Sequence, residues 1–203
     1  MLRSKREYDA IAKIVIDIYL DYGIKKFPID VFDICRKLGI DLVPYSEFSE
    51  REVSLLKKRS MDAFFVPATE CSPFMIFYND NLQEVKSEGR QRFSIMHEVK
   101  HYVCNETKET EEGEDLADYF ARYFLCPIPV LVVRGIYNQS EIISEFKTSA
   151  SAAANASRNL QNRMKRYKNS LFEYEKPLII QLFGDEYLEG GGDDDSDKKQ
   201  TSL

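Results

Sequence analysis

The two histidines of this 203-residue chain lie four positions apart, in His97-Glu98-Val99-Lys100-His101, and this motif constrains the fold more than any other feature. On a helix, residues four apart share a face, with Cβ atoms roughly 5–6 Å apart. Two imidazoles placed in this way can bind one zinc ion at about 2.0–2.1 Å per nitrogen. Glu98 lies beside the first histidine and can reach a metal-bound water without being a ligand. The motif therefore predicts a helix that supplies two metal ligands and a general base.

Apolar residues surround the motif and predict that its helix, from about Arg90 to Cys104, is largely buried. They are Phe93, Ile95, Met96, Val99, Tyr102 and Val103. Buried imidazoles need polar partners or a metal, because an unsatisfied polar group in the protein interior costs free energy. The alternative without a metal, a helix with two partly exposed histidines, fits these neighbours poorly.

A catalytic zinc ion needs three protein ligands and an open position for water. Because no third histidine exists, the remaining ligand must be a carboxylate or a cysteine, and Glu114 is the best candidate. Glu114 and Asp118 share one face of a second predicted helix, from about Glu112 to Leu125, so Asp118 could accept a hydrogen bond from a ligand imidazole. An acidic first turn also stabilises a helix without any metal. The sequence leaves four other candidates for the third ligand: Cys104, Asp115, Glu111 and Glu112.

Composition and charge argue against several classes of protein. The chain is 43% hydrophobic and 31% charged, which is typical of a soluble globular protein, and its net charge of −6 disfavours attraction to nucleic acid or to anionic membranes. It has no run of eighteen apolar residues, and its N-terminal segment lacks the uninterrupted apolar core of a signal peptide. The four cysteines form no C-x-x-C pair, which favours reduced thiols. We therefore expect a cytoplasmic protein without a membrane partner.

Hydrophobic periodicity and turn residues predict the other elements. We expect helices over about 4–22, 28–39 and, in two pieces, 139–168, with short strands over 40–43, 63–66 and 74–78. The last two strands should be antiparallel neighbours, and the apolar segment 177–183 could be a strand or a packed tail. These elements predict an α+β fold in which a small antiparallel sheet packs beside the two helices that carry the site, followed by a helical C-terminal region.

Both motif helices resemble those of the ImmA/IrrE family of metallopeptidases, which pairs an R-x-R-F-T-x-A-H-E-x-G-H helix with an E-x-E-A-N-x-F-A-x-x-L-L-M-P helix. The matching residues besides the motif are Arg90, Arg92, Phe93, Ala117, Asp118, Phe120, Ala121, Leu125 and Pro127. Segments 28–43 and 76–79 are also similar to family elements, so the resemblance covers roughly residues 5–170. The chain departs from the pattern at Lys100, where glycine is common, at Leu116, where glutamate is frequent, and at Cys126, where methionine is usual.

The resemblance implies a zincin-like (gluzincin-like) fold and one zinc ion per chain, bound by His97, His101 and Glu114. It further implies that Glu98 is the catalytic base and that Asp118 hydrogen-bonds a ligand. The domains would then be a metallopeptidase core over 1–130, a helical and helix-turn-helix-like region over 131–183, and a disordered acidic tail over 184–203.

The function that the resemblance implies is that of a bacterial zinc endopeptidase, often carried by mobile elements or linked to stress responses. Its substrate would be a helix-turn-helix transcriptional repressor. Because both histidines would be ligands, a tyrosine, an arginine or the zinc alone must stabilise the oxyanion. The sequence does not rank the candidates, which are Tyr78, Arg90, Arg92, Tyr102 and Tyr119.

The basic C-terminal region supports an alternative function. Between residues 130 and 170, lysine and arginine outnumber the acids by seven to two, and residues 149–163 could form a recognition helix. A solvated helical cap is the simpler interpretation, because the whole chain is acidic. The alternative protein is thus a DNA-binding or protein-interaction regulator with a non-catalytic metal site. Glu98 argues against a purely structural zinc site, which has no use for a base.

Overall fold

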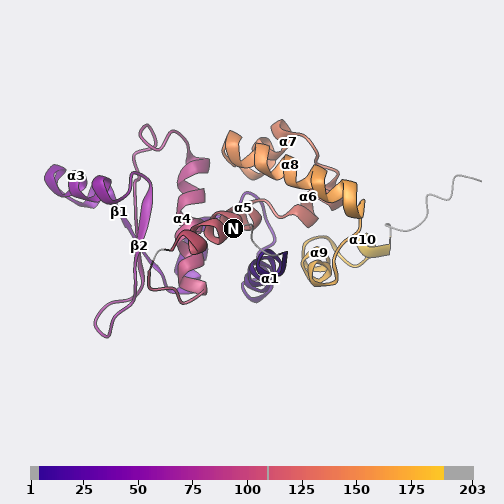
Figure 1. Ribbon diagram of the computed structural model, residues 1–203, viewed down its shortest axis with the longest axis horizontal. Coiled ribbons are helices and arrows are strands. Elements are labelled where there is room, and N and C mark those ends of the chain that lie inside the picture. Colours follow the sequence, from indigo (N-terminus) through magenta and orange to yellow (C-terminus); the bar gives the residue numbers. More distant parts are fainter. Residues whose placement is uncertain (1–4, 109, 190–203) are drawn as a thin grey trace, which may run out of the picture.

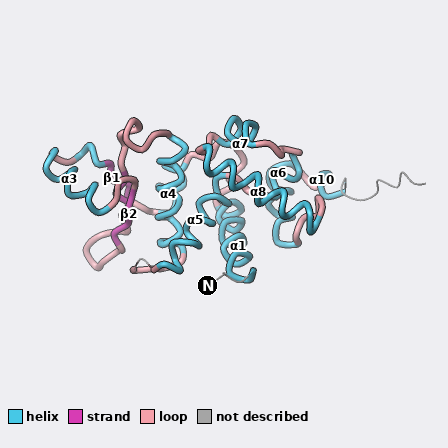
Figure 2. Tube along the Cα trace, turned by 45° about the horizontal axis from the view of Figure 1, so that its top comes forward, coloured by secondary structure: helices cyan, strands magenta, loops and turns pink. Residues whose placement is uncertain are grey.

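Helices α4 (Glu88–Val103) and α5 (Glu111–Leu125) form the centre of the fold and pack along each other. The structure is a computed structural model that describes residues 5–108 and 110–189 (Figure 1). A three-stranded sheet and α3 lie on one side of this pair, and the C-terminal helices lie at the other end of the molecule (Figures 1 and 2). The other elements are α1 (Lys5–Asp21), α2 (Val31–Leu38), β1 (Asp41–Pro44), α3 (Glu50–Arg59), β2 (Ala63–Val66), β3 (Met75–Tyr78), α6 (Ile128–Arg134), α7 (Gln139–Phe146), α8 (Ala150–Tyr167), α9 (Lys176–Phe183) and α10 (Glu186–Glu189). The predicted α+β class is confirmed.

The sheet has the order β1-β3-β2 and is mixed. β2 and β3 are antiparallel, as predicted, with Phe64 opposite Phe77. β1, however, pairs in parallel with β3, with Leu42 opposite Ile76, so the expectation of a wholly antiparallel sheet is wrong. The physical reason is the connection through α3: it lets β2 run opposite to β1. β3 then pairs antiparallel with β2 and therefore runs in the same direction as β1.

Capping side chains fix where the two central helices begin. Ser87 accepts a hydrogen bond from the backbone N–H of Arg90 at the start of α4. Thr110 accepts one from the N–H of Gly113 at the start of α5. These bonds satisfy N–H groups that have no partner inside the helix. They also set the positions of the motif residues along each helix.

The C-terminal region is more helical than the sequence indicated. The apolar segment 177–183, which the sequence left as a strand or a packed tail, forms α9. A short apolar run does not distinguish a strand from a buried helix, and tertiary contacts decide here. Leu178 and Ile179 are fully buried, and Gln181 Nε2 donates to the Tyr19 carbonyl at 2.7 Å. The predicted tail begins inside the described region, where α10 forms, while residues 190–203 lie outside it.

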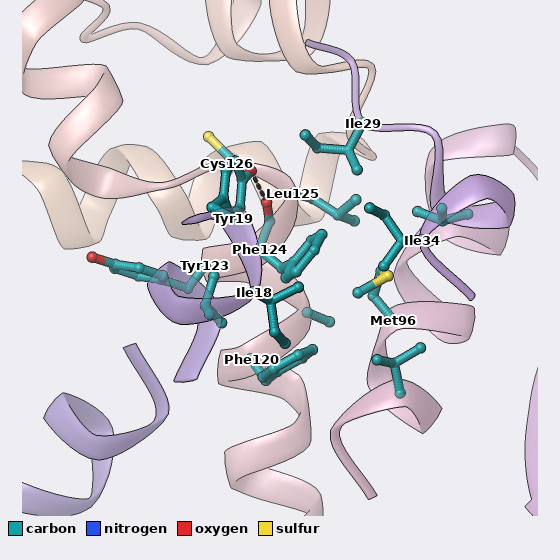
Figure 3. Packing of buried hydrophobic residues seen from close by; sticks show 14 of the residues in the cluster. Ile18, Tyr19, Ile29, Ile34, Met96, Phe120, Tyr123, Phe124, Leu125 and Cys126 are labelled. Atoms are coloured by element: carbon teal, nitrogen blue, oxygen red, sulfur yellow. Dashed lines mark hydrogen bonds between the residues drawn. The ribbon is translucent and has the colours of Figure 1, made fainter. Parts of the chain in front are cut away.

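The hydrophobic core joins α1, α4 and α5 (Figure 3). Tyr19 of α1 and Phe120 and Phe124 of α5 are fully buried in it. The Tyr19 hydroxyl donates to the Phe124 carbonyl at 2.6 Å, so the one polar atom of this side chain is satisfied. The back of the central helix pair is thereby held rigidly, while its other face carries the histidines.

The stretch Glu111–Arg134, which comprises α5 and α6, is long and apolar enough to cross a membrane by length and composition. Within it, 67% of the apolar window is buried inside the protein. A core helix has the same character, and the contacts of α5 with α4 and α1 account for its apolar residues.

Candidate metal centre

Helix α4 presents His97, Glu98 and His101 near its C-terminal end. The His101 side chain is fully buried, and its ring stacks on Phe65 of β2, with 4.7 Å between ring centroids. The His97 ring is 5.6 Å from the His101 ring and is mostly buried. The four-residue spacing thus brings both imidazoles to the same side of α4, toward α5.

Glu114 of α5 completes a cluster with the two histidines. One donor atom from each of the three side chains lies within 4.8 Å of the others. Glu114 Oε2 is 2.9 Å from His97 Nε2, and Glu114 Oε1 is 3.4 Å from His101 Nε2. Within the described ranges, this cluster contains none of the other third-ligand candidates. Cys104, Asp115, Glu111 and Glu112 therefore lie outside it.

The donor atoms of the cluster suit a cation. His101 Nε2 and Glu114 Oε1 are buried and face each other, yet neither has a hydrogen-bond partner. Because His101 Nδ1 lies 2.7 Å from a carboxylate oxygen of Glu106, Nδ1 carries the proton in the neutral imidazole. Nε2 is then a lone-pair donor that points at a second acceptor, which is unfavourable in the interior unless a positive ion lies between them. Two imidazoles and one carboxylate are a ligand set for a divalent metal.

Asp118 lies one helical turn after Glu114 and binds the opposite nitrogen of His97. Its Oδ1 is 3.0 Å from His97 Nδ1, and its Oδ2 accepts a hydrogen bond from Arg122 at 3.2 Å. Burial lowers the pKa of His97, but the Asp118 hydrogen bond and the charges of Glu98 and Glu114 outweigh this, so the pKa is raised. Burial alone would raise the pKa of Asp118, but His97 and Arg122 lower it. Asp118 thus stays ionised and orients the His97 ring.

Glu106 and Lys100 form a second supporting pair, which the sequence did not reveal. Glu106 lies in the loop between α4 and α5, and it accepts hydrogen bonds from His101 Nδ1 at 2.7 Å and from Lys100 Nζ at 2.5 Å. The Lys100 side chain is fully buried, and its Nζ also donates to the Gly113 carbonyl at 3.1 Å. Lys100 therefore ties the loop, through Glu106, to His101. The only sequence signal for Glu106 was its place in an acidic loop, where several other acids are equivalent.

A cavity of about 310 Å³ opens onto the cluster. His97, Glu98 and Glu114 line it, together with the edge strand β2. Glu98 is only 8% exposed, and its negative charge contributes to the raised pKa of His97. Arg59, at the end of α3, is the basic residue among the described residues that line this cavity, and the sequence did not single it out.

The five residues considered as oxyanion or substrate contacts do not line this cavity. Arg92 is buried and donates to the carbonyls of Ile29, Phe146 and Lys147, while the Tyr102 hydroxyl donates to the Leu38 carbonyl. Their hydrogen bonds hold other segments against α4.

The remaining three candidates also have other neighbours. Tyr78 packs edge-to-face on Phe32, and Tyr119 packs on Tyr8 at another face of α5. Arg90 forms a bidentate pair with Asp62, and Asp62 lines the cavity.

Comparison with known protein families gives an independent result. The family model Peptidase_M78, described as the IrrE N-terminal-like domain, matches residues 73–158, which include the complete cluster. Searches of curated proteins and of solved structures found no match.

Proposed function

We propose that the chain is a zinc endopeptidase that cleaves a helix-turn-helix repressor. The match of residues 73–158 to the IrrE N-terminal-like domain, a metallopeptidase domain, supports a metal-dependent hydrolase. The observation that carries the metal assignment is the pair of buried, unpartnered atoms His101 Nε2 and Glu114 Oε1. Both atoms would become ligands, together with His97 Nε2. A repressor acts on DNA inside the cell, so a cytoplasmic location is part of the proposal.

Glu98 is the proposed catalytic base. Bound zinc supplies Lewis-acid chemistry, because it activates water and polarises the peptide carbonyl. The Glu98 carboxylate lines the same cavity as His97, and it can take the proton of the attacking water and later deliver it to the leaving amine. Asp118 and Glu106 hold the Nδ1 atoms of the two histidines, which keeps both Nε2 atoms directed to the metal position.

The free edge of β2 offers a place for the substrate backbone. The Asn79 N–H donates to the Asp62 carbonyl at 2.8 Å, so the antiparallel alternation directs the backbone polar groups of Ala63 and Phe65 away from β3. No strand of the described residues pairs with this edge. An extended peptide could therefore add to the sheet along the cavity that Ala63 and Phe64 line.

The packing of the turn before α8 gives little support to the DNA-binding alternative. In a helix-turn-helix protein, the first residues of the recognition helix contact the bases. Here the turn before α8 lies against α4, since a Cβ atom on Gly89 would be 2.7 Å from the backbone N of Ser149. The turn that precedes α8 is therefore packed on a helix of the metal centre, although Ala150 and Ser151 in the first turn of α8 are exposed.

The first test is the zinc content of the purified full chain and of three variants. We expect about one zinc per chain in the parent and in Glu111→Ala, the matched control in the first turn of α5. His101→Ala and Glu114→Ala should lose most of it. No zinc in the parent after metal is supplied would overturn the proposal.

The second test is cleavage by the zinc-loaded chain. Fragments of a panel of helix-turn-helix repressors would be detected by mass spectrometry, with a peptide library in parallel. Glu98→Gln should keep its zinc and lose cleavage by at least about 100-fold. Cleavage of library peptides but of no repressor would leave an endopeptidase and remove the repressor assignment. Undiminished cleavage by Glu98→Gln would exclude Glu98 as the base.

A further inference from the structure

A second cavity lies on another face of α5, away from the metal cluster. Its volume is about 480 Å³, which falls within the range of small-molecule sites. Helices α1, α5 and α8, the start of α6 and the segment before α9 form its walls. The walls include six aromatic side chains: Tyr8, Tyr119, Tyr123, Tyr167, Phe172 and Tyr174. We refer to it as the aromatic–basic cavity.

The charge of this cavity is opposite to that of the chain. Four cationic side chains line it, whereas Asp9 and Glu175 are the acids among the described residues of its lining. Glu175 is fully buried and accepts hydrogen bonds from both Nη atoms of Arg163 at 2.6 Å, so the charges of these two residues cancel. Within residues 5–108 and 110–189, neither Lys5 nor Arg166 is paired with a carboxylate. A positive cavity in a protein of net charge −6 favours an anionic occupant.

The aromatic side chains of the walls indicate that the anionic ligand also carries an aromatic ring. Lys5 Nζ lies 5.0 Å from the ring centroid of Tyr167 and donates to its hydroxyl at 3.2 Å, so a cation and a ring face are presented together. Tyr8 and Tyr119, which also line the cavity, pack edge-to-face with 4.8 Å between their ring centroids. Flat rings gain free energy when they pack against such aromatic surfaces.

Arg122 connects this cavity to the metal centre. It lines the aromatic–basic cavity, yet its Nη1 donates to Asp118 Oδ2 at 3.2 Å. The other oxygen of Asp118 binds His97 Nδ1 at 3.0 Å. An anion that draws the guanidinium of Arg122 toward itself would weaken its bond to Asp118 and so alter the support of His97.

We propose that the aromatic–basic cavity binds a small anion that carries an aromatic ring, and that Arg122 transmits its binding to His97. The site is thus a regulatory one, and this second part rests on the proposed zinc peptidase function. Binding linkage is reciprocal, so zinc must change the affinity for the anion by the same factor as the anion changes the affinity for zinc.

Calorimetric titration of the metal-free full chain tests the binding site. Metal-free protein is needed because zinc itself binds phosphate and carboxylate groups. The probes are AMP, which joins a ring to a phosphate, and benzoate, which joins a ring to a carboxylate; adenosine and inorganic phosphate are the separate halves. We expect AMP or benzoate to bind with a Kd below about 1 mM, and each half at least about tenfold more weakly.

Arg166→Gln should weaken this binding at least about tenfold, because it removes a cation that has no carboxylate partner. Arg158→Gln, on the same helix but outside the cavity, should leave it unchanged. The site is overturned if neither probe binds below about 1 mM, or if Arg158→Gln weakens binding as much as Arg166→Gln.

Repeating the titration with zinc-loaded protein tests the coupling. The parent should show a Kd that differs by about fivefold or more between the two forms, and Arg122→Gln should abolish this difference. Equal affinities in the parent would overturn the coupling. If the protein holds zinc and cleaves peptides but these titrations fail, only this inference is overturned. If the chain binds no zinc, the proposed function is overturned, and the metal-free titration still decides whether the anion site exists.

Discussion

Glu106 should matter far more to stability than its buried partner Lys100. In Glu106→Ala, Lys100 Nζ would keep only the Gly113 carbonyl as a partner, although the Lys100 side chain is completely buried. Removing one partner of a buried ion pair costs about 3–5 kcal/mol, and the 29% exposure of the Glu106 side chain places this variant at the lower end, about 3 kcal/mol. The melting temperature of the metal-free protein should fall by about 6–12 °C.

Lys100→Met should behave oppositely. Methionine replaces the buried charge with an apolar side chain of similar volume, and Glu106 keeps its hydrogen bond to His101 and some contact with solvent. The free energy of unfolding should therefore change by less than about 1 kcal/mol. Zinc affinity separates the two variants again, because only Glu106→Ala removes the acceptor of His101 Nδ1 and should weaken zinc binding about 10–100-fold.

The assays are urea unfolding of metal-free protein and competition for zinc with a chromophoric chelator. The double variant, with both substitutions, should recover most of the stability lost in Glu106→Ala while its zinc binding stays weak. The reasoning is refuted if Lys100→Met costs as much stability as Glu106→Ala, or if the double variant regains normal zinc affinity.

Three further predictions concern pH, close packing and the core. The affinity for zinc should weaken as the pH falls, and the weakening should begin above the ordinary histidine pKa, because the pKa of His97 is raised in the metal-free protein and protons compete with the metal for Nε2. Competition with a chelator at stepped pH measures this, and an affinity that stays constant down to pH 4.5 would contradict it. Gly89→Ala should destabilise the protein by about 1–3 kcal/mol in urea unfolding, because the added Cβ would lie 2.7 Å from backbone atoms of Thr148 and Ser149; an unchanged midpoint would show that the turn can move. Phe124→Ala should cost about 3–5 kcal/mol, since the ring is fully buried, and a loss below about 1 kcal/mol would mean that the site collapses around the missing ring.

The structure brings His97, His101 and Glu114 together as the sequence predicted, because much of the geometry is local. Two pairs with four-residue spacing, His97 with His101 and Glu114 with Asp118, each lie on one helix, and helical periodicity alone places each pair on one face. Only the packing of α4 on α5 had to be assumed. The roles of the single residues in catalysis remain predictions.

The features that the sequence did not predict all depend on tertiary contacts. β1 runs parallel to β3 because of the path that α3 takes, and the composition of a four-residue strand carries no information about direction. Segment 177–183 became a helix because it packs on α1. Glu106 was indistinguishable from the other acids of its loop until the loop was placed against Lys100.

The bonds of Arg92 have a consequence for the newly made chain. This side chain of the metal helix donates to carbonyls at positions 29, 146 and 147, which lie on both sides of it in the sequence. Until residue 147 has left the ribosome, a buried guanidinium on α4 lacks two of its three acceptors, and the helix that carries both histidines is not fully supported. We therefore expect the nascent protein to acquire tight metal binding late in synthesis, so that a growing chain is protected from becoming an active protease before its fold is complete.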